Sequence, residues 1–234
     1  MNEKHGIIIG IFVLGGIISL LFSPLFHLTE IKVKGLQILE KDEVVNSSLR
    51  ENYEGDNIFL LNRKKIRDII LDNPYIKEVS VGREFPSGLQ VEVEERVPLA
   101  KINNNGSFLV FDHSGVILEK GSQNTRFDVP ELKGLGYSFS GDRLEFSSSL
   151  SHLVQALKQV DFDNRLQLEE FEWREDNFNG EMKENIEIFL GGEESLDRKF
   201  DILNSTIKKI NSEKLSVDYI DLKSVSRPVI KIRE

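Results

Sequence analysis

One uncharged apolar run near the N-terminus constrains this chain more than any other feature. It extends from Ile7 to Phe26, a stretch of 20 residues. As an α-helix it would cover about 30 Å at roughly 1.5 Å per residue, which matches the hydrocarbon thickness of a bilayer. Its glycines and serines are compatible with lipid, because a helix satisfies its own backbone hydrogen bonds there. The run therefore predicts a transmembrane helix over residues 7–26.

A cleaved signal peptide and a buried core helix are two other interpretations of the run. Signal peptides have shorter apolar regions, of about 7–15 residues, followed by a small-residue cleavage site. No such site occurs between Ser23 and His27, and a core helix this apolar would be unusual at the N-terminus. We therefore expect an uncleaved anchor. Residues 1–6 would form a cytoplasmic tail, as Lys4 favours, and the 208 residues after the span would be extracytoplasmic.

Charge and cysteine content narrow the class of the remaining chain. The formal net charge is −9, whereas nucleic-acid-binding proteins present basic patches. We therefore expect no nucleic-acid partner. The chain contains no cysteine, so it has no disulfides, thiolate nucleophiles or cysteine-ligated zinc. Its domains must be held together by their hydrophobic cores.

The first 70 or so residues after the run alternate between two periodicities. Leu28–Lys34 has strand periodicity, and Leu39–Asn52 has helical periodicity. Asn62 is a suitable N-cap for a second helix, which Pro74 ends. Two further strands follow, joined by a turn at residues 86–88. The predicted order is strand–helix–helix–strand–strand, with one face of the sheet apolar and the other solvated.

A motif in the last two strands resembles a known domain. It reads Val79-x-Val81-x-x-x-x-Pro86-x-x-Leu89-x-Val91-x-Val93-x-Glu95-Arg96-x-Pro98-x-Ala100. With the order of elements before it, this motif is similar to the POTRA domain of the bacterial division protein family FtsQ/DivIB. In that family the domain follows a membrane span. The resemblance implies a POTRA domain over residues 27–98.

Residues 99–234 predict a second, β-rich domain with two helices, which gives the whole chain an α+β fold class. The two helices carry apolar stripes that begin at Leu150 and Leu196, and Gly134–Gly141 is predicted as a loop. Predicted strands lie at Phe108–Phe111, Val116–Leu118, Phe171–Trp173, Ile186–Leu190, Tyr219–Leu222 and Val229–Ile232. An extended Val129–Gly134 segment and the last two strands also resemble the FtsQ/DivIB family.

The sequence offers no catalytic, cofactor or metal site. The four histidines are far apart, and none has the spacing of a metal motif. The acidic clusters at Glu92–Glu95 and Glu169–Glu172 are better interpreted as solvated strand faces than as glycosidase carboxylate pairs. We therefore expect a scaffold and not an enzyme. An anchored cell-wall hydrolase would need a catalytic constellation, and a POTRA-containing envelope assembly factor would need barrel strands where helices are predicted.

The last strand is the feature most suited to binding a partner. No later segment follows it in the sequence, so its edge would be free to pair with another strand. The predicted partner-binding residues are Tyr219, Ser224, Ser226, Val229, Ile230, Lys231 and Ile232. The resemblance implies that the partners are FtsB/DivIC-like and FtsL-like bitopic coiled-coil proteins, together with other divisome proteins of the septal synthase complex. It also implies a place in the cytoplasmic membrane at the division septum, and a role in regulating septal peptidoglycan synthesis.

Overall fold

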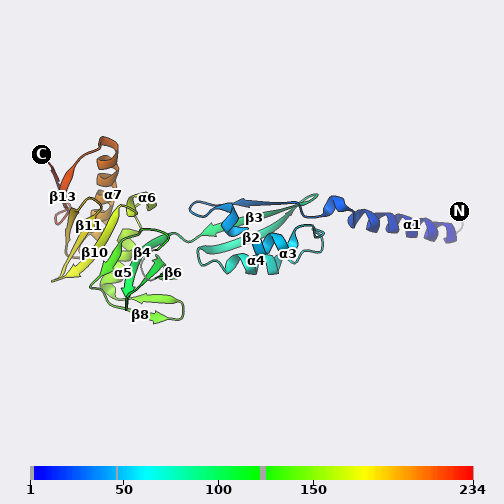
Figure 1. Ribbon diagram of the computed structural model, residues 1–234, viewed down its shortest axis with the longest axis horizontal. Coiled ribbons are helices and arrows are strands. Elements are labelled where there is room, and N and C mark those ends of the chain that lie inside the picture. The colour runs from blue at the N-terminus through cyan, green and yellow to red at the C-terminus, as the bar shows by residue number, and fades with distance from the viewer. Residues whose placement is uncertain (1–2, 46, 122–124, 234) are drawn as a thin grey trace. The chain divides into compact units, whose positions relative to one another are not determined.

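The computed structural model describes residues 3–45, 47–121 and 125–233. The chain divides into two compact units, unit 1 (Met1–Arg96) and unit 2 (Val97–Glu234), each described below by itself (Figure 1). This division falls two residues before the predicted end of the first domain. Residues 1–2 of the predicted cytoplasmic tail lie outside the described residues.

The apolar run folds as two helices instead of one. Helix α1 covers Glu3–Leu21, and a short 3-10 helix, η1, covers Pro24–Phe26. Ser23 between them has an extended backbone (φ −63°, ψ 147°), because a residue before proline is pushed out of the α region. The predicted single helix over 7–26 is therefore wrong in its last part. Within the described part of the chain, no helix combines the length and apolar character needed to cross a membrane.

Unit 1 contains a three-stranded sheet partly covered by helices. Its strands are β1 (Glu30–Lys34), β2 (Ile76–Glu84) and β3 (Gly88–Glu95), in the spatial order β1-β3-β2. Strand β3 lies parallel to β1 and antiparallel to β2. The helices are α2 (Lys41–Val44), α3 (Ser47–Tyr53) and α4 (Arg63–Leu71). The predicted order of strands and helices is confirmed, except that α2 and α3 replace one helix.

The break in that helix occurs at Val45, whose backbone is not helical (φ −98°, ψ 67°). Val44 and Val45 are both buried. The helical pattern over Leu39–Asn52 did not predict this break, which leaves α2 and α3 as separate helices.

Helix α4 and the β3 strand contribute the core of unit 1. Ile66 and Ile70 of α4 are buried, as are Val91 and Val93 of β3. The predicted N-cap is confirmed, since Asn62 Oδ1 accepts a hydrogen bond from the Lys65 N–H at 3.2 Å. The alternation of β3 therefore separates an apolar face from an exposed one.

Glu95 is an exception to the predicted solvated acidic face. Its carboxylate accepts backbone N–H groups from Gln37 at 3.1 Å, Ile38 at 2.8 Å and Leu39 at 3.1 Å. Glu92, by contrast, is exposed. Glu95 therefore holds the segment between β1 and α2 in place, and its role is structural.

Unit 2 is built on one nine-stranded sheet. The spatial order is β14-β13-β12-β11-β10-β7-β4-β5-β6. In chain order the strands are β4 (Pro98–Asn104), β5 (Ser107–Asp112), β6 (Ile117–Gly121), β7 (Glu131–Lys133), β10 (Leu168–Arg174), β11 (Asn177–Met182), β12 (Ile186–Gly191), β13 (Val217–Asp221) and β14 (Val229–Ile232).

Helices α5 (Ser148–Leu157), α6 (Phe162–Arg165) and α7 (Leu196–Glu213) complete unit 2. The core between helices and sheet is apolar, and the rings of Phe171 on β10 and Phe200 on α7 lie 5.3 Å apart. The prediction of two helices missed α6, which is a single turn. The α+β class is confirmed.

One predicted loop is wrong. Where Gly134–Gly141 was expected to be irregular, the chain forms a hairpin of β8 (Tyr137–Ser140) and β9 (Arg143–Phe146). Gly141 has a positive φ of 62° and begins the two-residue connection. A glycine followed by aspartate between short strands is a hairpin signal, but strands of four residues are too short for alternation to identify.

Candidate partner-binding edge

The edge of the sheet in unit 2 is positioned by α7 and the strand that follows it. Helix α7 ends at Lys214, which has a left-handed backbone (φ 51°, ψ 46°) and turns the chain. Strand β13 then runs parallel to β12, with Ile188 opposite Ile220. Both isoleucines are buried. The crossover from β12 through α7 therefore fixes β13 firmly in the sheet.

Strand β14 returns antiparallel to β13 through a short loop. Ser224 O accepts a hydrogen bond from the Arg227 N–H at 3.1 Å, and the hydroxyls of Ser224 and Ser226 lie 3.0 Å apart. In the paired strands, Tyr219 lies opposite Lys231 and Ile220 lies opposite Ile230. The structure thus brings all the predicted partner-binding residues together on β13, the connecting loop and β14.

β14 is one of the two edge strands of the nine in the described part of the sheet, and β6 is the other. All four of its residues are exposed, and three of them are apolar: Val229 is 48% exposed, Ile230 38% and Ile232 51%. The expected exposed final edge is therefore present in the fold. Partner binding by these residues stays a prediction.

The two faces of the edge differ in chemistry. Ile230 lies beside Ile220, on the face of the sheet that the core covers. Lys231 lies on the opposite face, beside Tyr219. The Tyr219 ring meets the Phe189 ring of β12 edge-on at 6.0 Å. A strand added to β14 would therefore meet aliphatic side chains on one face and an aromatic, charged surface on the other.

Two contacts of this second face were not predicted. Lys223 Nζ lies 4.9 Å from the centre of the Phe189 ring, and Arg233 Nε donates a hydrogen bond to Asp218 Oδ1 at 2.7 Å. Phe189 belongs to a strand distant in sequence, so only the pairing of β12 with β13 reveals it. The ion pair adds a polar border next to the apolar strand.

The backbone of β14 presents hydrogen-bonding groups to the free side. The Arg233 N–H donates to Ser216 O at 2.8 Å and so points toward β13. Backbone N–H groups alternate in direction along an antiparallel strand. The N–H groups of Ile230 and Ile232 therefore point away from β13. Pro228, which has no N–H, occupies a position with the same outward direction, where a missing donor is tolerated.

Further polar side chains of unit 2 form contacts within the fold. His152 Nδ1 contacts Glu193 Oε2 at 2.9 Å, and hydrogen bonds from Ser149 and His152 lower the pKa of Glu193. Arg165 is buried and donates to Pro98 O at 3.1 Å, and burial lowers its pKa to about 10. In the part of the chain that the structure describes, no group of three or more potential metal ligands occurs.

Two known domain families match the chain, one in each unit. Residues 26–96 match the family described as "POTRA domain, FtsQ-type". Residues 100–223 match "Cell division protein FtsQ/DivIB, C-terminal", which covers more than half of the chain. The two matches follow one another along the chain, with three residues between them.

Individual relatives agree with these matches over almost the full length. "Cell division protein DivIB" of Clostridium acetobutylicum is 27% identical over 217 residues, covering 90% of this chain and 85% of the relative. "Cell division protein FtsQ" of Geotalea daltonii is 25% identical, covering 89% and 77%. A solved structure of the major extracytoplasmic domain of DivIB from Geobacillus stearothermophilus matches with 16% identity and a TM-score of 0.37, covering 53% of this chain and 99% of that domain.

Proposed function

The chain belongs to the FtsQ/DivIB family of cell division proteins, and from this membership we propose that it is a scaffold of the division machinery. In this role it binds the small coiled-coil division proteins of the FtsB/DivIC and FtsL kinds through the β14 edge. The resulting complex regulates septal peptidoglycan synthesis. The chain contributes binding surfaces and no catalytic step.

The observation that carries this proposal is the combination of outward backbone groups and exposed apolar side chains on β14. Strand addition to a free edge supplies main-chain hydrogen bonds, and the alternating side chains supply specificity. Ile230 and Ile232 are suited to aliphatic contacts with the partner. Tyr219 and Lys231 on the other face, with Ser224 and Ser226 in the loop, are suited to polar contacts at the border.

Attachment to a membrane is the second part of the proposal. The side chains of α1 from Ile7 onward are exposed around the whole helix, which is costly in water and favourable in lipid. We infer that α1, followed by Phe22 and η1, inserts into the cytoplasmic membrane and holds the rest of the chain on its outer side at the division septum. A reporter active only in the cytoplasm, fused after Glu234, would then be silent.

A pair of substitutions at one position tests the edge. Ile230→Pro removes an outward N–H and the isoleucine side chain, whereas Ile230→Ala removes most of the side chain and keeps the N–H. The readout is the affinity for the extracytoplasmic region of the DivIC-like protein of the same organism, alone and with the FtsL-like protein.

We expect Ile230→Pro to abolish binding and Ile230→Ala to weaken it less. Circular dichroism and the fluorescence of Trp173, the single tryptophan, check that unit 2 remains folded. If a folded Ile230→Pro variant, or a chain ending at Arg227, retains full affinity, the interface lies elsewhere.

A further inference from the structure

Unit 1 exposes a compact apolar surface beside the end of the apolar run. We call it the aromatic foot, and it consists of Phe26, Phe59, Leu60 and Phe85. The ring centres of Phe26 and Phe59 lie 5.1 Å apart, and those of Phe59 and Phe85 lie 5.5 Å apart. Leu60 is 69% exposed and Phe85 is 62% exposed. Three segments that are distant in sequence thus meet in one cluster, in which Phe26 is half-buried and the other three residues are exposed.

Polar contacts hold the foot in this conformation. Arg83 on β2 donates hydrogen bonds to the backbone oxygens of Ile58, Phe59 and Leu61, the last two at 3.0 and 3.4 Å. Ile58 and Leu61 are buried on either side of the exposed Phe59 and Leu60. The loop therefore has a defined inner and outer side. The exposed side chains of Phe59 and Leu60 therefore project from a backbone that Arg83 holds in place.

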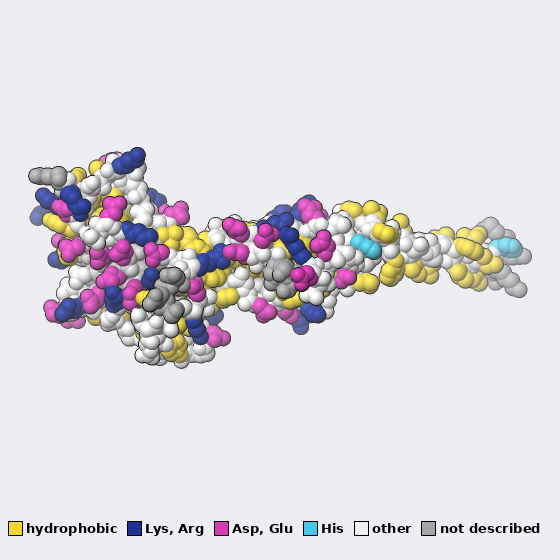
Figure 2. All heavy atoms as spheres, in the orientation of Figure 1, with side chains coloured by type: hydrophobic (Ala, Val, Ile, Leu, Met, Phe, Trp, Pro, Cys, Tyr) yellow, Lys and Arg dark blue, Asp and Glu magenta, His cyan; other side chains and the backbone are white. Residues whose placement is uncertain are grey.

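The foot is joined directly to the apolar run. Asn57 Nδ2 donates to Leu21 O, the last residue of α1, at 2.7 Å. The Ile58 N–H donates to Phe26 O at 2.9 Å. Phe22 and Leu25, which lie between these two anchor points, are exposed as well. Figure 2 shows hydrophobic side chains along α1 and at the end of unit 1 that adjoins it.

Basic side chains follow the foot immediately in the sequence. Arg63, Lys64 and Lys65 form the first turn of α4, and Arg67 follows in the second. All four are exposed, and none forms an ion pair with another residue that the structure describes. Aromatic and leucine side chains beside unpaired cations are the pattern of segments that lie in the interface of anionic membranes.

We propose that the aromatic foot inserts into the interfacial layer of the lipid bilayer, with Arg63, Lys64 and Lys65 at the phosphates of anionic lipids. This inference rests on the proposed insertion of α1, whose apolar surface is continuous with the foot. A bilayer is favoured over a second protein because the same surface continues into the exposed side chains of α1. Contact at both the helix and the foot would orient unit 1 on the membrane.

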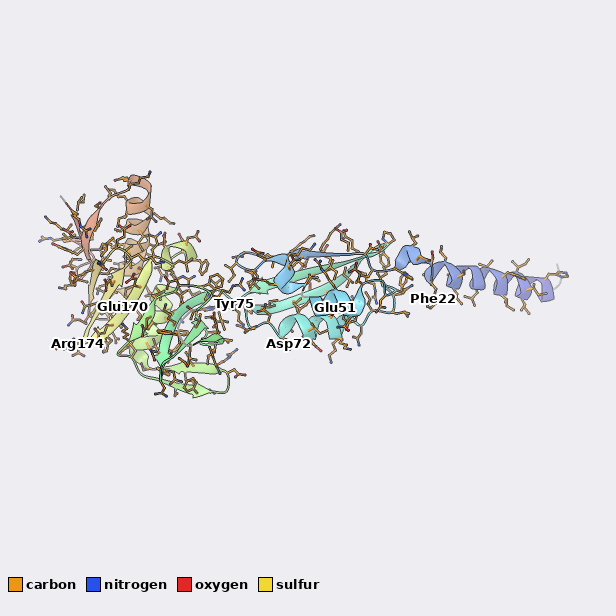
Figure 3. The ribbon with its side chains drawn as sticks, viewed as in Figure 1. Phe22, Glu51, Asp72, Tyr75, Glu170 and Arg174 are labelled. Carbon is orange, nitrogen blue, oxygen red and sulfur yellow. The ribbon has the colours of Figure 1, made fainter. Side chains whose placement is uncertain are left out.

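Because the chain has no native cysteine, a fluorescent dye can be attached at a single chosen position. Single-cysteine variants of the full chain are made at Leu60 and Phe85 in the foot, at Leu14 in α1 and at Asp72. Figure 3 shows Asp72 farther from Phe22 than Glu51 is, and Asp72 is exposed. Each variant is labelled with an environment-sensitive dye and reconstituted in phosphatidylcholine–phosphatidylglycerol vesicles. Lipids carrying nitroxides near the headgroup or deep in the acyl chain then act as quenchers.

We expect blue-shifted emission at Leu60→Cys and Phe85→Cys, and quenching there by the shallow nitroxide. Leu14→Cys should be quenched by the deep nitroxide, and Asp72→Cys by neither. Quenching at Leu14 with foot positions that behave like Asp72 would overturn the inference and leave the insertion of α1 standing. A blue shift at the foot without quenching would mean that protein covers it, which also overturns the inference. No quenching at Leu14 would overturn the insertion of α1 and, with it, the inference.

The basic residues are tested separately in the same vesicles. The triple variant R63Q/K64Q/K65Q should lose most of the shallow quenching at the foot that depends on phosphatidylglycerol. Its matched control, K158Q/K209Q/K214Q, removes the same charge from exposed positions in unit 2 and should leave that quenching unchanged. Equal losses in both variants would show a general charge effect and would contradict the assigned lipid contacts.

Discussion

One edge strand of unit 1, β1, and one edge strand of unit 2, β14, differ in their exposed side chains. In unit 1, β1 is an edge strand whose exposed side chains, Glu30, Lys32 and Lys34, are all charged. In unit 2, β14 is an edge strand whose exposed side chains are mostly aliphatic. Charges on an edge strand discourage pairing with other chains. The contrast teaches that one edge is protected against strand addition and the other is open to it.

The largest expected effect tests whether the two units are independent. Ile66→Ala removes a fully buried side chain from unit 1 and should lower the free energy of unfolding of that unit by about 2–5 kcal/mol. Glu92→Ala, at an exposed position of β3, should change it by only about 0.5 kcal/mol or less. Denaturation followed by circular dichroism reports both units, and Trp173 fluorescence reports unit 2 alone.

If the β14 edge acts alone, Ile66→Ala should leave partner affinity unchanged under conditions where unit 2 is folded. A matching loss of partner affinity would show that the binding surface includes unit 1, and the comparison of the two edges would then be incomplete.

The second prediction concerns charged side chains on β14, of the kind that β1 already carries. The double variant I230K/I232K places two lysines on the exposed edge, where like charges and desolvation oppose a paired strand. We expect partner affinity to fall at least 30-fold, or about 2 kcal/mol, as for residues that dominate an interface. The measurement is calorimetric titration with the DivIC-like region.

Phe139→Lys is the control for one of the two charges that the double variant adds, because Phe139 is also an exposed apolar residue on a strand of unit 2. It should bind the partner as the wild type does. Equal losses in Phe139→Lys and I230K/I232K would point to net charge and not to the edge.

The third prediction concerns Glu95, which supports the β1 side of unit 1. Glu95→Ala leaves the backbone N–H groups of Gln37, Ile38 and Leu39 without their acceptor. Leaving buried donors unsatisfied costs about 1–3 kcal/mol; because the Gln37 hydrogen bond is exposed and the other two are only partly buried, unit 1 should lose stability toward the lower end of this range. Glu95→Gln, which keeps one acceptor oxygen, should lose less. A neutral effect of Glu95→Ala in chemical denaturation would contradict the structural role given to this carboxylate.

The smallest effect is a pH dependence of unit 2. Partial burial raises the pKa of Asp128, but hydrogen bonds from Lys183 and Lys101 outweigh it, and the net shift lowers the pKa below its ordinary value. A lowered pKa in the folded state adds stability above the unfolded pKa, and this stability is lost as pH falls through the folded pKa. Unit 2 should therefore lose some stability below about pH 4.

Asp128→Asn should make that acid decline shallower, as measured by Trp173 fluorescence in thermal melts between neutral and acidic pH. Because Asp128 is mostly exposed, the difference should be small. A steeper decline in the variant would reverse the sign argued here.

Local patterns predicted the order of elements in unit 1 and many elements of unit 2, but they missed the strands β4, β8, β9 and β11. Alternation in Leu89–Val93 predicted β3, and Asn62 predicted the start of α4. The apolar, β-branched run Val229–Ile232 also predicted β14. Some features were missed because strands as short as β8 and β9 show no clear alternation, and others because they depend on contacts between distant segments. The Phe189 contact, for example, requires the pairing of β12 with β13.

The aromatic foot illustrates the same limit. Phe59 and Phe85 are 26 residues apart, and each by itself is an ordinary apolar residue beside a turn. Only the Arg83 contacts and the hairpin of β2 and β3 bring them together. The candidate edge was accessible to sequence reasoning because it is a single short segment, whereas the foot is assembled by the fold.

Hydrogen exchange of the β14 backbone amides, with and without the DivIC-like partner, tests the central claim most directly. The outward amides of Ile230 and Ile232 should exchange rapidly in the free protein and become strongly protected in the complex. The amides of Val229 and Lys231, which point toward β13, should already be protected in the free protein. Tight binding with no added protection at Ile230 and Ile232 would contradict strand addition at this edge.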